Sequence, residues 1–259
     1  MQASLFVALG LLAGCLSGLI GIGGGVILVP ALIFFFGMSQ HLAQGTTLAL
    51  MVPPIGFLAA WSYYKQGYVN LRIAALVCVG FFFGGFCGAK LAEILPNATL
   101  EKIFAIGLGA LALKILISPA SSAEQAQQSH ESASSRSISF KTGLLLVIAG
   151  AVVGISSGLL GIGGGVLLVP ALSVLFGLSQ HEAQGTTLTL MVPPIGLLAA
   201  MQYYQNGDVN VTAGAFICAG FFFGALGGAR LAHGMSAHIL TKVFGVSVLL
   251  IAAKMFFAG

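Results

Sequence analysis

Two clusters of small and polar residues stand out in this chain as candidates for binding a small ligand. A glycine-rich segment at 21–25 returns at 161–165, and the sequence Gln-Gly-Thr-Thr at 44–47 returns at 184–187. Consecutive glycines let backbone N–H groups converge, and the Gln and Thr side chains add further donors. A group of hydrogen-bond donors with no bound cation among them favours the binding of an anion. The candidate substrate-binding residues are Gly21, Gly23, Gly24, Gly25, Gln44, Thr46, Thr47, Gly161, Gly163, Gly164, Gly165, Gln184, Thr186 and Thr187.

Close helix packing is an alternative explanation for many of the glycines. A spacing of four residues is typical of a face where two membrane helices meet, and it occurs at Gly10, Gly14 and Gly18 and at Gly80, Gly84 and Gly88. The segment 21–25 is more specific, because it precedes Pro30 at a place where a helix must break. No Gly-Lys-Ser/Thr follows it, so a nucleotide-binding loop is not expected. For the threonines, a bond back to their own helix remains an alternative.

Groups that could perform catalysis are missing from the apolar stretches. All the carboxylates lie in loops or near the ends of apolar runs, at Glu93, Glu101, Glu124, Glu131, Glu182 and Asp208. No Cys or His pair has the spacing of metal ligands. We therefore predict no catalytic residue, no metal site and no cofactor, and we do not expect an enzyme.

Residues at the ends of the apolar runs are expected at the membrane surface. His41 and His181 flank the second run of each half and are expected to face water. An aromatic belt is predicted from Trp61, Tyr63, Tyr64, Tyr203 and Tyr204.

Composition places the chain in a lipid bilayer. It is 58% hydrophobic and 6% charged, with a mean hydropathy of +1.05, whereas soluble domains are about 25% charged. So few charges cannot cover a water-facing surface. The ten Lys and Arg residues form no basic stripe, so nucleic acid is not expected as a partner.

The chain consists of two tandem repeats with a constant offset of 140 residues. Met51-Val52-Pro53-Pro54-Ile55-Gly56, for example, returns at 191–196. Residues 1–119 align without a gap to 141–259. The segment 120–140, rich in Ser, Gln and Ala, is left as a polar linker.

Each half contains four apolar runs, which in the first half are about 5–37, 42–64, 69–92 and 98–117. A continuous helix over 5–37 would be about 48 Å long, whereas the hydrocarbon core is about 30 Å thick. We therefore expect a helical hairpin that breaks at the glycines, followed by three spans. The fold class is an all-α polytopic membrane protein of two tandem repeats, each with a glycine-broken hairpin and three spans.

An odd number of crossings in each half predicts that the two repeats are inverted relative to each other. Most basic residues then lie on one side, at Lys65, Arg72, Lys114, Arg136, Lys141, Arg230 and Lys242, with Lys90, Lys102 and Lys254 on the other. The positive-inside rule makes the linker cytoplasmic and both termini external. A break at Pro53-Pro54 that hides another re-entrant turn would change the parity, so a parallel repeat remains an alternative.

The repeated motifs resemble those of the sulfite exporter TauE/SafE family of bacterial and archaeal anion transporters. The resemblance rests on the segment from Gly18 to Pro30, its copy at 158–170, Gly45-Thr46-Thr47, and Gly88-Ala89-Lys90-Leu91-Ala92. It implies a multi-pass protein of the inner membrane that moves sulfur-containing anions such as sulfite, thiosulfate or organosulfonates.

The leading hypothesis is a secondary carrier for such an anion, and the alternative is a passive anion channel of the same architecture. No ATP-binding motif is present. The expected partners are a small sulfur-containing anion and the bilayer. The sequence leaves open the transported anion, the direction of transport, the energy source and the assembly state, a homodimer included.

Overall fold

The computed structural model describes residues 2–20, 24–53, 57–117, 139–231, 246, 248–250 and 252–256. Over these residues the secondary structure is helical, without a strand, which agrees with the expected all-α class. Two helices, α5 and α8, are long and apolar enough to span a bilayer, with mean hydropathies of 1.9 and 2.3. The candidate residues Gly21 and Gly23, the linker and most of 232–259 lie outside the described residues.

The helices of the two halves follow one another in the same order. The first half contains α1 (Gln2–Ile20), α2 (Gly25–Phe36), α3 (Gln40–Leu50), α4 (Phe57–Lys65), α5 (Leu71–Ile94) and α6 (Asn97–Ile117). The second half contains α8 (Phe140–Leu160), α9 (Gly165–Phe176), α10 (Gln180–Leu190), α11 (Leu197–Gln205) and α12 (Val211–Leu231).

The first apolar run of each half breaks at the glycines, as expected from its length. α2 begins at Gly25 and is 12 residues long, which is about 18 Å. It ends at Gly37, whose φ of 63° is left-handed and suits glycine. The N–H groups of Gly37 and Met38 then donate to the carbonyls of Ile33 and Leu32, which completes a Schellman cap. α2 is therefore a half-length helix.

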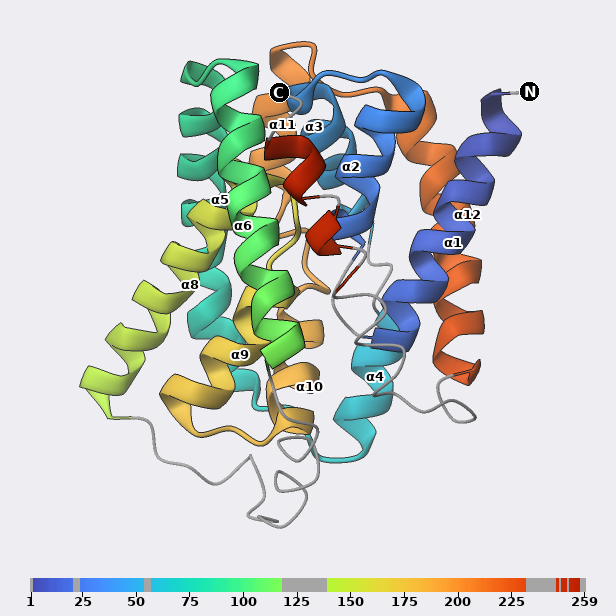
Figure 1. The fold of residues 1–259 in the computed structure, drawn as a ribbon. Helices are drawn as coiled ribbons and strands as arrows, with labels where there is room; N and C mark the ends of the chain where they lie inside the picture. The colour runs from blue at the N-terminus through green and yellow to red at the C-terminus, as the bar shows by residue number, and fades with distance from the viewer. Residues whose placement is uncertain are drawn as a thin grey trace.

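The second run is not the single span expected over 42–64. It is divided into α3 and α4, because Pro53-Pro54 offers no N–H to continue a helix. Ser39 starts α3 by accepting a hydrogen bond from the N–H of Leu42 at 3.2 Å. α3 lies in the upper part and α4 in the lower part of the molecule (Figure 1). Together their 20 residues are about as long as one crossing.

Glycines join the long helices in two pairs, α1 with α12 and α5 with α8. A Cβ atom on Gly10 or Gly14 would meet the backbone of α12, and one on Gly84 or Gly88 would meet the backbone of α8. These glycines therefore pack helices closely, as the four-residue spacing predicts. The same contact occurs at Gly80.

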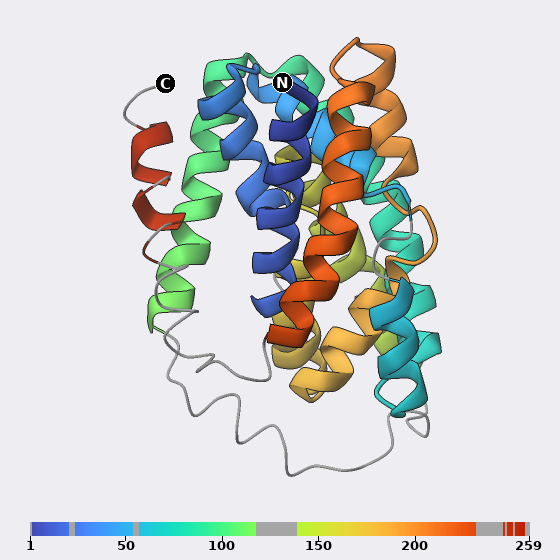
Figure 2. The same cartoon turned by 90° about the vertical axis from the view of Figure 1, so that its right-hand side faces the viewer.

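The contacts of one half recur in the other with the roles of the halves exchanged. α1 packs on α12 as α8 packs on α5, and α3 packs on α11 as α10 packs on α4. α1 starts at the upper end of the molecule and runs downward (Figures 1 and 2), whereas α8 starts at the lower end and runs upward (Figure 1). Each of these four helix pairs thus combines both halves, and α1 and α8, which are equivalent in the sequence repeat, point in opposite directions.

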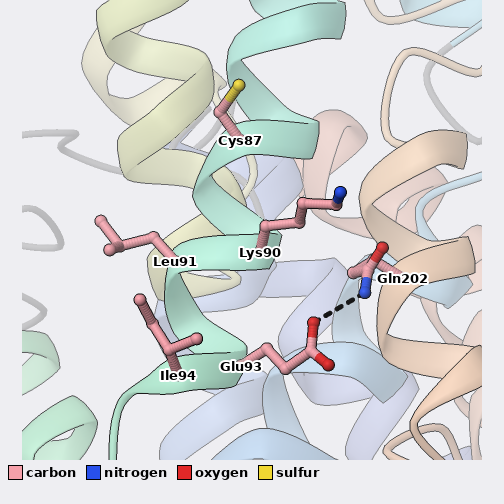
Figure 3. Close-up of a pocket in the computed structure, with 6 residues that line it drawn as sticks. All are labelled: Cys87, Lys90, Leu91, Glu93, Ile94 and Gln202. Atoms are coloured by element: carbon pink, nitrogen blue, oxygen red, sulfur yellow. Dashed lines mark hydrogen bonds between the residues drawn. The ribbon is translucent and has the colours of Figure 1, made fainter.

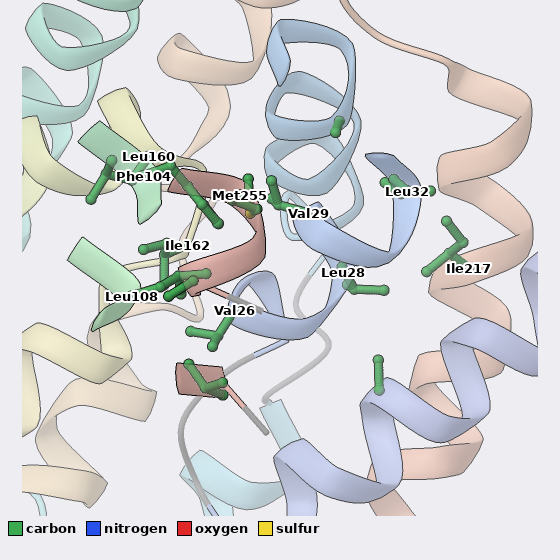
Figure 4. Packing of buried hydrophobic residues seen from close by; sticks show 14 of the residues in the cluster. Val26, Leu28, Val29, Leu32, Phe104, Leu108, Leu160, Ile162, Ile217 and Met255 are labelled. Atoms are coloured by element: carbon green, nitrogen blue, oxygen red, sulfur yellow. The ribbon is translucent and has the colours of Figure 1, made fainter. Parts of the chain in front are cut away.

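The largest buried cluster surrounds α2 (Figure 4). Leu28 and Leu32 of α2 are fully buried, and so are Phe104 and Leu108 of α6. Ile162, which belongs to the second glycine segment, is in the same cluster. α2 is therefore anchored in the apolar interior, together with Ile162 of the second glycine segment.

Candidate functional site

The glycine segments of the two halves touch each other in the interior. A Cβ atom on Gly25 would meet the carbonyl oxygens of Gly161 and Ile162. Gly161 and Gly163 have φ values of 66° and 76°, in the left-handed region. The contact and the backbone conformation both require glycine here, which explains why these positions carry no side chain.

Gly24 and Gly164 are equivalent residues at the N-termini of α2 and α9, and both face an aromatic ring. A Cβ atom on Gly24 would meet the ring of Phe221, and one on Gly164 would meet the ring of Phe81. Neither helix start has a side-chain cap. The positive end of each helix dipole therefore lies beside Gly24 or Gly164, in an arrangement suited to negative charge.

Gln44 lies directly against the second glycine segment. A Cβ atom on Gly161 would be 2.8 Å from the Cβ of Gln44. The Gln44 side chain is 0% exposed, and its Nε2 has no hydrogen-bond partner among the described residues. A buried amide N–H without an acceptor is costly, so Nε2 is the natural donor for a ligand at this position.

Tyr203 orients the Gln44 amide. Its hydroxyl is 3.2 Å from Oε1 of Gln44 and 3.0 Å from the carbonyl oxygen of Gly158, to both of which it can donate. In the other half, the Tyr63 hydroxyl donates to Oε1 of Gln184 at 3.1 Å. Each tyrosine therefore comes from one half and fixes the glutamine of the other.

Tyr203 and Tyr63 are thus wrongly assigned to an aromatic belt by the sequence. Tyr203 is only 2% exposed, and burial of Tyr63 is also substantial. Trp61, Tyr64 and Tyr204 are exposed. Tyr203, which is buried, and Tyr63, which is half-buried, share a place one residue before an exposed tyrosine in both repeats, and this is the signal that distinguishes them.

Thr46 and Thr186 connect the halves in the same crossed way. The hydroxyl oxygen of Thr46 accepts from the N–H of Asn210 at 2.9 Å, and that of Thr186 accepts from the N–H of Asn70 at 3.2 Å. Each Asn side chain also caps its own helix, α12 or α5. Thr46 and Thr186 therefore hold the starts of long helices, and in this arrangement their hydroxyl oxygens act as acceptors.

Thr47 and Thr187 differ in their bonding. The Thr47 hydroxyl donates back to the carbonyl of Ala43 at 2.8 Å, which is the alternative that the sequence leaves open. The Thr187 hydroxyl is buried and has no partner among the described residues, and its Cγ2 is 4.0 Å from the Cβ position of Gly165. Thr189, which the sequence does not single out, is a further buried hydroxyl without a described partner.

Gly45 and Gly185 make room for these crossed contacts. A Cβ atom on Gly45 would meet Tyr203 and the carbonyl of Asp208, and one on Gly185 would meet Tyr63 and the carbonyl of Tyr68. The glycine inside each Gln-Gly-Thr-Thr motif therefore lets α3 or α10 approach the other half closely.

A separate hollow of about 640 Å³ opens between α5 and α11 (Figure 3). It is lined by Cys87, Lys90, Leu91, Glu93, Ile94 and Gln202, and Gln202 Nε2 donates to Glu93 Oε2 at 2.7 Å. None of its lining residues is among the candidates predicted from the sequence. This hollow is at the surface, whereas Gly24, Gly25, Gly161, Gly164 and Gln44 are buried.

The chain belongs to a family of membrane transporters. Residues 6–255 match the family described as "Sulfite exporter TauE/SafE", so the resemblance of the motifs is confirmed and the chain is a member of that family. No solved structure matches it significantly.

Several curated relatives carry transporter names and align over nearly the whole chain. "Probable membrane transporter protein YunE" of Bacillus subtilis is 25% identical and aligns over 100% of this chain and 99% of its own. A "Probable membrane transporter protein" of Xylella fastidiosa is 31% identical, over 96% of this chain and 94% of its own. A "Probable membrane transporter protein MamO" of Paramagnetospirillum magneticum is 25% identical, over 96% of this chain and 44% of its own.

Proposed function

We propose that this protein is a secondary carrier for a small sulfur-containing anion in the inner membrane of a bacterium or archaeon. The observation that carries the proposal is the Gln44 amide, whose nitrogen is fully buried without a described partner beside Gly161. An oxyanion would supply the missing acceptor. The helix starts at Gly24 and Gly164 add positive partial charge to the same region.

The proposed anion site combines the candidates of both halves. Gln44 and Gln184 provide amide donors, Thr187 provides a hydroxyl, and the glycine segments bring backbone N–H groups close. Thr46 and Thr186 act in this proposal as supports, because their oxygens accept from Asn210 and Asn70. Tyr203 and Tyr63 keep the amide oxygens occupied, so that the amide nitrogens remain available to the anion.

The mechanism follows from an inverted repeat of residues 1–119 and 141–259. The exchanged contacts and the opposite directions of α1 and α8 support this arrangement. In such a fold, each half forms the same contacts with the other, so two equivalent packings that open to opposite sides have similar free energies. Alternation between them would expose the central glycines and glutamines first to one side and then to the other, with the linker cytoplasmic.

Flux into proteoliposomes tests the proposal. The purified protein is assayed with sulfite, thiosulfate, sulfoacetate, taurine and sulfate. Saturable uptake with counterflow of at least one sulfur-containing anion is expected. Flux that does not saturate and shows no counterflow would indicate the alternative, a passive anion channel, and absence of flux for every anion would refute the choice of substrate class.

Two glutamine variants connect the flux to the site. Gln44→Ala and Gln184→Ala should each weaken anion binding by about 1–3 kcal/mol, the cost of losing one donor to a charged group. Gln205→Ala, at an exposed position at the end of α11, is the control and should bind normally. Unchanged affinity in both glutamine variants would place the anion elsewhere.

A further inference from the structure

His41 does not simply face water, as the sequence suggests. It is the second residue of α3, and both of its ring nitrogens lie within hydrogen-bond distance of the corner between α5 and α6. Nε2 is 2.8 Å from the carbonyl oxygen of Ala92, and Nδ1 is 2.7 Å from Oδ1 of Asn97. The side chain therefore fastens the start of α3 to that corner.

Both contacts require a proton on the imidazole. The carbonyl of Ala92 can only accept, so Nε2 must donate. The backbone N–H of His41 also donates to Oδ1 of Asn97, at 3.3 Å, which identifies that atom as the acceptor and makes Nδ1 a second donor. Both nitrogens of one imidazole carry protons only in the cationic form. A neutral His41 keeps one of the two bonds and loses the other.

The charges around His41 come from several elements. Asp208, in the loop between α11 and α12, interacts electrostatically with His41, and Glu93 at the end of α5 interacts with Asp208. Burial raises the pKa of the Asp208 carboxyl, the nearby His41 lowers it, and Glu93 raises it. Lys90 of α5 is exposed and lies over the ring of Phe86.

On α6, Glu101 and Lys102 follow Asn97 by about one helical turn.

The equivalent histidine of the second half has a different environment. His181 packs against the rings of Tyr68 and Tyr63, at centroid distances of 5.2 and 6.4 Å. Tyr68 occupies the position equivalent to Asp208, so the carboxylate that faces His41 has no counterpart beside His181. The hydrogen bonds that need a proton on both ring nitrogens of His41 thus lie at the end of the molecule where α3 begins, which is the upper end in Figure 1.

We propose that His41 is a proton-binding site that closes this end of the transporter. Proton uptake from the adjacent solution completes both bonds and ties α3 to the α5–α6 corner. Proton release removes one bond and loosens the start of α3. α3 packs on α2, α6, α11 and α12, and α5 packs on α8, α10 and α11, so the bond joins two helices that both pack on α11. The conformational equilibrium, and with it transport, then depends on the pH at this end.

Hydrogen exchange tests the proposal without any anion. The full-length protein and His41→Gln are compared in nanodiscs by mass spectrometry at pH 5.5 and pH 8. The single amide nitrogen of glutamine can reach only one of the two acceptors, the carbonyl of Ala92 or Oδ1 of Asn97, and it takes up no proton. Glutamine therefore imitates the neutral histidine. Peptides that cover the start of α3 should exchange about tenfold faster in the variant at pH 5.5, the factor expected for one hydrogen bond. At pH 8 the two proteins should exchange alike.

The control is His181→Gln, which should leave the exchange of α3 unchanged at both pH values. In ¹⁵N-histidine spectra of the wild type at pH 5.5, the His41 signals, assigned by their loss in His41→Gln, should show two protonated nitrogens. An equal difference in exchange at both pH values would mean that His41 only packs, and no difference at either pH would mean that it does not fasten α3. Either result would overturn the proposal, as would a neutral His41 at pH 5.5.

Discussion

Removal of the Tyr203 hydroxyl perturbs the candidate site with the smallest change in shape. Tyr203→Phe deprives two buried acceptors of their donor, Oε1 of Gln44 and the carbonyl of Gly158. Gly158 is in the last turn of α8, where carbonyls lack helical partners. Each buried acceptor left without a donor costs about 1–3 kcal/mol, and partial relaxation keeps the total free energy of unfolding within about 1–3 kcal/mol of the wild type.

The same variant should weaken anion binding if Tyr203 orients the amide. Without the hydroxyl, the Gln44 amide can turn its oxygen toward the anion, and one donor is lost. A loss of about 1–3 kcal/mol corresponds to about a 5- to 150-fold rise in Kd. Sulfite binding is measured by calorimetry on the purified protein, and its stability by thermal unfolding.

Tyr204→Phe is the matched control, because Tyr204 is the next residue in the chain and is 62% exposed. It should bind sulfite and unfold like the wild type. If Tyr203→Phe is destabilised but binds sulfite with unchanged affinity, the hydroxyl supports only α8. If Tyr203→Phe equals Tyr204→Phe in both measurements, the reasoning from the buried hydrogen bonds fails altogether.

Three further predictions follow from the backbone. Gly163→Ala places a Cβ at a φ of 76°, which should lower the free energy of unfolding by about 1–2 kcal/mol and reduce sulfite flux. Gly196→Ala has open space around its Cβ position and should leave the flux unchanged. Equal flux in the two variants would refute a requirement for glycine at 163. Gly84→Ala meets the backbone of α8 and should lower the thermal stability by about 1–3 kcal/mol with little change in Kd, and the opposite pattern would contradict a packing role. Reporter fusions should place the linker near Gln125 in the cytoplasm and the C-terminus outside, and a cytoplasmic signal from both would establish a parallel repeat.

Length and steric arguments predict the local breaks of the fold. The run over 5–37 is too long for one crossing, so the break before Gly25 follows from the thickness of the bilayer. The four-residue glycine spacing likewise predicts contacts that the helix pairs make. The sequence gives the break at Pro53-Pro54, which divides α3 from α4, only as an alternative to a single span, because a hydropathy pattern averages over a few residues that leave the helix.

Contacts between the halves are the part that the sequence does not predict. Tyr203 lies at the end of an apolar run, where aromatic residues commonly reach the membrane surface, and its partner Gln44 is 159 residues away. His41 meets Asn97 across 56 residues. Side-chain type and position in a run do not encode such pairings, because burial is decided by which helices pack together.

The crossed contacts give a physical reason why the two halves belong to one chain. The amide of Gln44 is oriented by Tyr203, and that of Gln184 by Tyr63, so neither half can orient its own glutamine. The glycines at 45 and 185 permit these contacts only when the other half is present. Without the second half, the buried Gln44 amide would lack the hydroxyl that donates to its oxygen, and a buried polar group without a partner is costly in an apolar interior. Fusion of the halves keeps each tyrosine beside its glutamine, and the difference between Asp208 and Tyr68 shows how the two ends of such a protein can then diverge while the shared centre is maintained.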